Sequence, residues 1–145
     1  MLSVLIEQLA LIVAALFAGA AVYVSAVEHP ARLGLDDRAL LAQWKPSYAR
    51  GTAMQASLAL VGTVLALAAA YFTWDWRWLI GAVLIFANWP YTFLVIMPVN
   101  HILEATAPDA ANAQTRALLV RWGNLHAGRS ALGLAATLAD LWAIL

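Results

Sequence analysis

Long apolar runs dominate the chain, and most charged residues fall in the short stretches between them. Three runs contain no Lys, Arg, Asp or Glu, and they extend from Gln8 to Val27, from Gly51 to Trp74 and from Trp78 to Leu103. About 20 apolar residues are enough for a helix to cross the hydrocarbon core of a bilayer. Each run therefore predicts one membrane-spanning helix. A fourth run, Ser130 to Leu145, is too short to cross alone, so its helix must begin in the polar segment before it.

Prolines between the runs indicate where the helices should begin and end. We expect Pro30 to stop the first helix, Pro46 to open the second within its first turn, and Pro98 to end the third. The sequence then predicts helices at about 4–27, 47–72, 77–98 and 113–145. No internal repeat is evident. The expected fold is an all-α, integral membrane four-helix up-down bundle, with residues 1–145 forming a single transmembrane domain.

Composition supports a membrane protein and narrows the kinds of chemistry. The chain has 145 residues, of which 64% are hydrophobic and 11% charged, and a soluble helical bundle needs far more charge on its surface. There is no cysteine, so a disulfide framework, a thiolate nucleophile and a Cys-ligated iron–sulfur cluster are excluded. A net charge of zero gives no electrostatic reason to expect nucleic acid as a partner. The first run lacks Lys and Arg and is preceded by Glu7, so we expect a retained helix and not a cleaved signal peptide.

The basic residues predict how the chain is oriented in the bilayer. Most of them lie in the connections after the first and third runs: Arg32, Arg38, Lys45, Arg50, Arg116 and Arg121. Positively charged loops stay in the cytoplasm. We therefore expect a multi-pass protein of the bacterial inner membrane, with both termini outside the cytoplasm. The partners expected are the lipid bilayer, a hydrophobic aromatic small molecule and, through stripes of small residues, a second copy of the chain.

Polar residues occur at depths where a lipid-facing side chain would be costly. Asn88 lies about 15 Å along the third helix and Arg129 about 24 Å from the C-terminus, at 1.5 Å per residue. Trp122, His126 and Arg129 stand at positions i, i+4 and i+7, so they share one face of the fourth helix. Ionisable groups at such depth usually face a protein interior or a wet cavity. The distribution predicts a cavity between the helices that opens towards the cytoplasm.

Each of these residues also has a structural interpretation. Arg129 can be an ion-pair partner of Glu28, Asn88 can satisfy carbonyl groups freed by the kink at Pro90, and His29 can be an interfacial residue at a helix end. His126 is the hardest to explain structurally, because an imidazole titrates near neutrality. His29 and His126 can also be paired across the bundle as haem or copper ligands, although no local motif marks a metal site.

Five short motifs give the chain a resemblance to a known family. They are Glu28-His29-Pro30, Trp44-Lys45-Pro46-Ser47-Tyr48, Asn88-Trp89-Pro90-Tyr91-Thr92, Pro98-Val99-Asn100 and Arg121-Trp122-Gly123-Asn124-Leu125-His126. In this order and spacing they resemble the anthrone oxygenase-like family of small four-helix membrane proteins.

The resemblance implies that molecular oxygen oxidises an anthrone-type polycyclic phenol to a quinone without a cofactor. On this reading His126 is the base, Arg129 and Asn88 stabilise the developing anion, and His29 is a second acid–base group. The residues expected to bind the substrate are Trp89, Tyr91, Thr92, Trp122, Asn124, Tyr48, Gln55, Arg50, Glu28 and Asn100. The sequence leaves one alternative open, a non-enzymatic lipid-, quinone- or haem-binding small membrane subunit.

Overall fold

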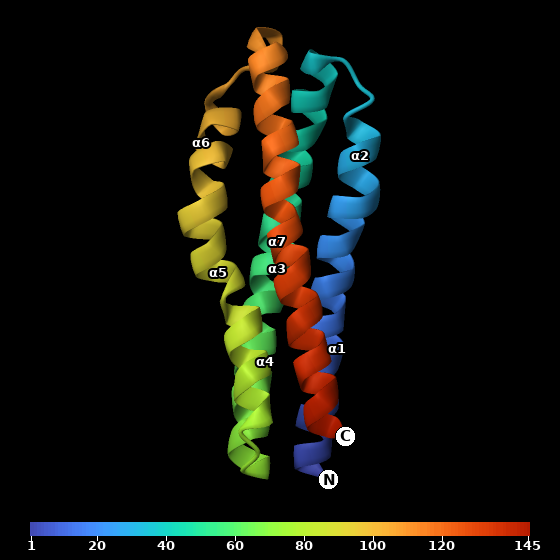
Figure 1. Ribbon diagram of the computed structural model, residues 1–145, viewed down its shortest axis with the longest axis vertical. Coiled ribbons are helices and arrows are strands. Elements are labelled where there is room, and N and C mark those ends of the chain that lie inside the picture. Colours follow the sequence, from blue (N-terminus) through green and yellow to red (C-terminus); the bar gives the residue numbers. More distant parts are fainter.

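The computed structural model describes all residues 1–145, and every regular element in it is a helix. Four rods run side by side, and the two chain ends lie at the same end of the bundle (Figure 1). This arrangement confirms the expected all-α bundle. In chain order the elements are α1 (Leu2–Tyr23), η1 (Val24–Glu28), α2 (His29–Arg32), α3 (Asp37–Thr73), α4 (Arg77–Phe86), α5 (Asn88–Tyr91), η2 (Thr92–Ile96), α6 (Met97–Ala105), η3 (Pro108–Ala110) and α7 (Ala113–Ile144).

The rods follow the apolar runs of the sequence. The first rod joins α1, η1 and α2, the second is α3, the third joins α4 to α6, and the fourth is α7. The first three, at residues 2–32, 37–73 and 77–105, are long and apolar enough to cross a membrane. Large apolar side chains such as Tyr71, Val83 and Leu94 point outwards. An apolar outer surface of this kind suits contact with lipid.

The second rod begins ten residues earlier than its expected start at residue 47. Asp36 caps it, because its carboxylate accepts a hydrogen bond of 2.9 Å from the backbone N–H of Ala39. Pro46 therefore lies inside the helix and does not open it. Pro46 cannot donate to the carbonyl of Ala42, but both residues are on the exposed side of the helix. Burial of the opposite face, including Trp44, holds this extra stretch in place.

The first and third rods continue beyond the prolines that were expected to end them. Each contains one π-helical turn, η1 or η2, whose last residue stands two positions before Pro30 or Pro98. In an α-helix a proline ring clashes with the carbonyl four residues earlier. Here the N–H of the residue before each proline bonds a carbonyl five residues back, His29 to Val24 and Met97 to Thr92. The wider turn relieves the clash, so the rods reach residues 32 and 105.

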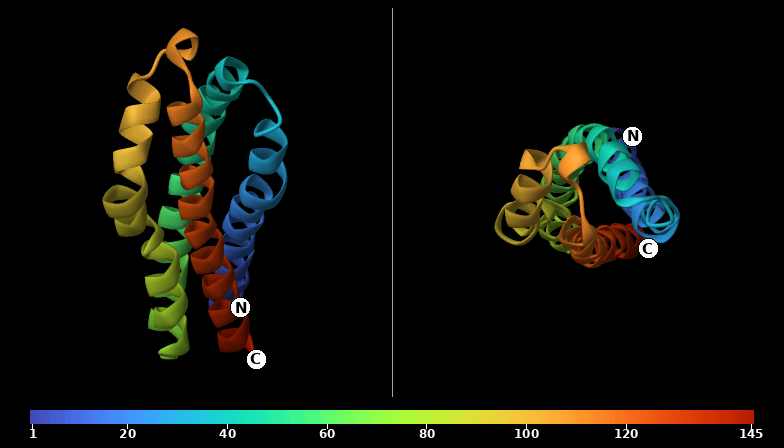
Figure 2. Two further views of the ribbon diagram at one scale, coloured as in Figure 1. Left: turned by 45° about the horizontal axis from the view of Figure 1, so that its top comes forward. Right: turned by 90° about the horizontal axis from the view of Figure 1, so that it is seen from above.

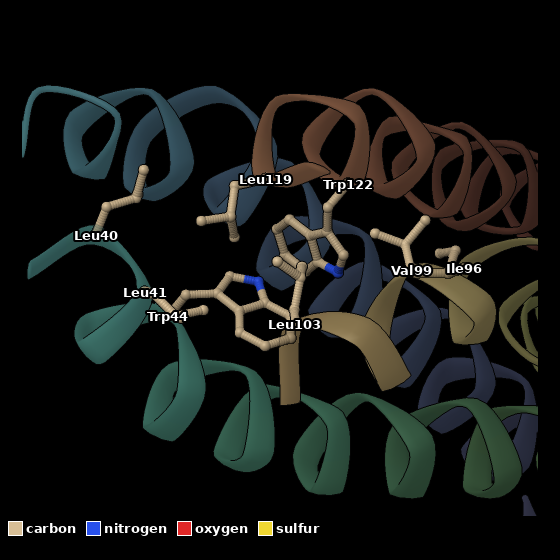
Figure 3. Close-up of a cluster of buried hydrophobic side chains, with 8 residues drawn as sticks. All are labelled: Leu40, Leu41, Trp44, Ile96, Val99, Leu103, Leu119 and Trp122. Atoms are coloured by element: carbon tan, nitrogen blue, oxygen red, sulfur yellow. The ribbon is translucent and has the colours of Figure 1, made fainter. Parts of the chain in front are cut away.

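The bundle is packed differently in its two halves. Near the termini the buried residues are mostly small, and alanines of α1, α3, α4 and α7 let the rods approach closely. In the other half the core contains larger side chains, with Trp44 of α3 and Trp122 of α7 in an edge-to-face contact (Figure 3). In that half the α5–η2–α6 part of the third rod is also displaced sideways from the line of α4 (Figure 2). The wider half is where polar side chains enter the interior.

Candidate functional site

A pocket lies in the wide half of the bundle, with residues from all four rods in its wall. We call it the polar pocket, and its volume is about 380 Å³ when the space open to the surroundings is included. Its lining residues are Val24, Ser47, Tyr48, Gly51, Thr52, Gln55, Ile96, Asn100, Trp122, His126 and Arg129. Six of these residues were expected from the sequence to bind substrate or to act in catalysis, on the basis of helix position and motif alone: Tyr48, Gln55, Asn100, Trp122, His126 and Arg129.

His126 is held from behind by two serines. Its Nδ1 lies 3.0 Å from the hydroxyl of Ser25, which is itself 2.9 Å from the hydroxyl of Ser130. The ring is stacked against Trp122, with 4.9 Å between ring centroids. Nε2 makes no hydrogen bond with the protein. His126 is one of the residues that line the polar pocket.

Arg129, one turn further along α7, is a buried cation without a counter-ion. Its side chain is 7% exposed, and none of the four ion pairs of the protein involves it. Nε is buried without a hydrogen-bond partner, and the guanidinium carbon lies 5.6 Å from the ring centroid of Phe17. Glu28, the ion-pair partner that the structural interpretation offered for Arg129, accepts hydrogen bonds from Arg32 and Ser47 instead. A buried arginine in this state is suited to an anionic oxygen on a ligand.

Asn100 fixes the direction of the Tyr48 hydroxyl. The indole N–H of Trp122 donates to Oδ1 of Asn100 at 2.9 Å, and Nδ2 of Asn100 donates to the Tyr48 oxygen at 3.0 Å. An indole nitrogen can only donate, so this contact settles which end of the amide faces Tyr48. Tyr48 is stacked on Trp44 with 4.7 Å between centroids. Since its oxygen accepts from Asn100, the Tyr48 proton is free to be donated elsewhere.

A second pocket, which we call the lateral pocket, adjoins the first and has a volume of about 380 Å³, again including the space open to the surroundings. It lies between α3 and the α5–η2 segment and is lined by Thr52, Ala56, Ala59, Asn88, Trp89, Thr92, Phe93, Met97 and Arg129. Thr52 and Arg129 belong to both pockets. The three residues expected at Asn88, Trp89 and Thr92 thus come together here and not beside His126.

The side-chain amide of Asn88 has one end bonded within its own helix rod and the other end without a hydrogen-bond partner. Its Nδ2 donates to the carbonyl of Ile85, three residues earlier in the same rod, at 3.1 Å. Its Oδ1 is buried without a partner.

Several expected site residues lie outside both pockets. Asn124 is exposed, and Arg50 is exposed beside Glu28 in a groove between the first rod and α3. The Tyr91 hydroxyl donates to the carbonyl of Leu125 at 2.8 Å, so this ring ties η2 and α5 to α7. Helical spacing alone did not separate residues that face a pocket from those that face lipid or a neighbouring helix.

His29 is buried behind the polar pocket. Its ring lies 5.1 Å from the ring of Trp122 and packs over Gly123, where an added Cβ would come within 2.4 Å of its Cδ2. Both ring nitrogens are buried without partners. Trp122 therefore contacts both His29 and His126. No group of three or more His, Cys, Asp or Glu side chains is placed to hold a metal ion.

The sequence analysis missed Ser25, Ser130 and Thr52. Ser130 stands four residues after His126, and this spacing was a usable signal. Ser25 lies on η1, and nothing local predicted a π-turn that brings it to α7. Thr52 was one of several small polar residues on α3 with no feature to single it out.

Comparison with known proteins bears on these residues. Residues 44–139 match the sequence profile of the family described as Anthrone oxygenase. The matched range includes Tyr48, Asn100, His126 and Arg129. The chain belongs to the anthrone oxygenase family. It is similar to an anthrone oxygenase of Claviceps purpurea (strain 20.1), with 31% identity over 131 residues, which cover 81% of this chain and 75% of the relative. No solved structure matches the chain.

Proposed function

We propose that this protein is an integral membrane oxygenase that uses molecular oxygen to oxidise an anthrone-type hydroxyaromatic compound to its quinone. Membership of the family supports the reaction class, and three rods suited to crossing a bilayer support the membrane location. The fourth rod completes the bundle, with the wide half towards the cytoplasm. The observation that supports it most directly is that His126 and Arg129 line one pocket: His126 is bonded to the protein through Nδ1 alone, and Arg129 has a buried Nε without a partner.

His126 is the proposed base. When Nδ1 carries the ring proton and donates it to Ser25, Nε2 keeps a lone pair that faces the polar pocket, and Ser25 donates in turn to Ser130. Nε2 then removes one proton from the benzylic CH₂ of the substrate. The resulting carbanion is conjugated with the ring carbonyl, so its charge resides largely on that oxygen. Arg129 and the Tyr48 hydroxyl are the donors for this oxyanion.

The oxygen chemistry balances without a further reductant. The carbanion gives one electron to O₂, and the resulting radical and superoxide combine to form a C–O bond, which leaves a hydroperoxide after protonation by the imidazolium. Loss of the second C–H proton to His126 and cleavage of the O–O bond then give the carbonyl and water. The CH₂ group loses four electrons, and O₂ gains four, one oxygen atom ending in the quinone and one in water. Trp89 and Phe93 contact the apolar body of the substrate from the lateral pocket.

The test uses purified protein in detergent with 1,8-dihydroxyanthrone, followed by oxygen uptake and by the absorbance of the quinone above the uncatalysed background. His126→Ala is expected to lower turnover by at least about 100-fold, the contribution typical of a general base. His101→Ala is the matched control, since His101 is exposed and lines neither pocket. Full turnover by His126→Ala would remove His126 as the base. A wild-type protein with no turnover and a Soret band would favour a haem-binding subunit.

A further inference from the structure

The lateral pocket reaches the outer surface of the bundle. Phe93, one of its lining residues, is 54% exposed, and Thr92, Met97 and Ala56 are half-buried. At its inner end lie Thr52 and Arg129, which also line the polar pocket. The two pockets are therefore neighbours that share part of their wall, and one of them borders the side of the bundle while the other borders His126.

Two features of the chain create this opening. On α3 the lining residues are the small side chains of Thr52, Ala56 and Ala59, at positions i, i+4 and i+7, which leave a shallow strip along one helix face. Opposite this strip, the third rod is displaced sideways beyond α4 (Figure 2). Pro90 and the π-turn η2 lie at that displacement and account for it.

We infer that the lateral pocket is the entrance through which a flat, lipid-dissolved hydroxyaromatic compound passes from the bilayer to His126, and that its apolar body stays there during the reaction. The reaction itself rests on the proposed function, whereas the binding site and the route do not. In this chain the rim residues lie on rods that are apolar enough to cross a membrane. A compound dissolved in the hydrocarbon core therefore meets the opening without passing through water.

The polar groups of the pocket define the ligand further. Nδ2 of Asn88 donates to the Ile85 carbonyl, which can only accept, so Oδ1 is the end of the amide left without a partner. A ligand that satisfies Oδ1 must present a hydrogen-bond donor, such as a neutral phenol hydroxyl. Arg129 in turn requires an acceptor, a carbonyl or an oxyanion. Asn88 and Arg129 together select a planar molecule that has a hydroxyl group close to a ring carbonyl. The tilted rings of Trp89 and Phe93 would lie beside the body of this molecule.

Cysteine protection tests the binding site without turnover. The chain has no native cysteine, so Ala56→Cys places a single thiol on the floor of the lateral pocket, and Ala53→Cys places one on the exposed side of the same helix. Each variant is treated with N-ethylmaleimide in detergent, with and without 1,8-dihydroxyanthraquinone. At ten times its Kd the probe leaves about one protein in eleven free, so modification at position 56 should slow about ten-fold. Modification at position 53 should not change.

Equal modification of the Ala56→Cys thiol with and without saturating probe would overturn the inference, whether or not the wild-type protein consumes oxygen. Protection in a protein that has no turnover would support the binding site and refute only the proposed reaction.

A second pair of variants tests the route. Ala56→Trp fills the pocket, and Ala53→Trp adds the same side chain outside it. With 1,8-dihydroxyanthrone in detergent, kcat/KM of Ala56→Trp should fall at least about ten-fold below that of Ala53→Trp, the scale on which a pocket rejects an ill-fitting shape. Equal values for the two variants would exclude the lateral route.

Discussion

The hydroxyl oxygen of Ser25 lies 3.0 Å from Nδ1 of His126, although 101 residues separate the two in the chain. The contact joins the π-turn of the first rod to the middle of the fourth. No carboxylate takes this place behind the imidazole, and the next partner along is the neutral hydroxyl of Ser130. The ring is thus oriented by hydroxyl groups, each of which can either donate or accept a hydrogen bond. This suits an imidazole that takes up a proton and then releases it.

Ser25→Ala should reduce kcat by about ten- to hundred-fold, because a base that loses its orienting contact no longer meets the substrate in a reactive geometry. The pH profile of turnover should shift as well, which a purely structural role for Ser25 would not cause. Ser57→Ala is the control, since Ser57 is exposed and bonds only its own helix. Wild-type kcat with an unchanged profile would show that Ser25 does not position the ring.

Arg129→Met separates activity from stability. It removes a buried charge that has no ion pair, so the free energy of unfolding should rise by about 1–3 kcal/mol while turnover falls. Arg121→Met, on the exposed side of the same helix, should change neither quantity. Thermal unfolding and oxygen uptake on the same preparations provide the measurement. A less stable Arg129→Met protein would mean that the guanidinium is needed for packing.

Asn100→Leu should destabilise the protein by about 1–3 kcal/mol, because it leaves the buried Trp122 N–H without its acceptor and Tyr48 without its donor. Asn124→Leu replaces an exposed amide and should stay within about 0.5 kcal/mol of wild type. Chemical unfolding in detergent distinguishes the two. Similar midpoints for both variants would contradict the network around Asn100.

Gly123→Ala should lower stability by about 1–3 kcal/mol, the usual cost of overpacking. Its Cβ would stand 2.5 Å from Nε2 of His29, and this buried ring has no room to move away. Gly19→Ala adds a methyl group with nothing within 4 Å and should be neutral or slightly stabilising. The measurement is the melting temperature of each variant. Equal melting temperatures for Gly123→Ala and Gly19→Ala would contradict the close packing of His29 over Gly123.

The turn between α3 and α4 gives a pH-dependent prediction. The pKa of the Asp75 carboxyl lies below its ordinary value of 3.8, because the side chain and the backbone N–H of Arg77 both donate to it. A group with a lowered pKa stabilises the fold above its ordinary pKa, and this contribution is lost as the pH falls through the folded-state pKa. Asp75→Asn should therefore melt below wild type at neutral pH, and the gap should close in acid. A gap that persists in acid would mean that the charge of Asp75 is not its cause.

The sequence predicted the first three rods well because each of their apolar runs is long enough to cross a bilayer, so its helical character depends little on detail. It failed at Pro30, Pro46 and Pro98. Prolines end helices by a local rule, but here a π-turn or an exposed position removes the conflict.

A site residue was predictable where its position on one helix determined that it faces the interior. It was not predictable where its role depends on which residues of a second helix lie opposite it. His126 and Arg129 follow from their spacing on α7, since one face of that helix had to carry both. Asn124 was misplaced because motif membership says nothing about the direction a side chain faces, and Arg50 because a position near a helix end does not say so either. Ser25 and Ala56 gained their importance only from what lies opposite them in space, which no single stretch of sequence encodes.

Each π-turn has a further effect, on the angular register of everything beyond it. Deleting one residue within 24–28 would restore ordinary α-helical bonding and rotate the rest of the first rod by about 100° about its axis. His29 would leave the bundle interior and Pro30 would regain its steric conflict. The number of residues in this short segment therefore matters more to the fold than its mostly apolar composition suggests.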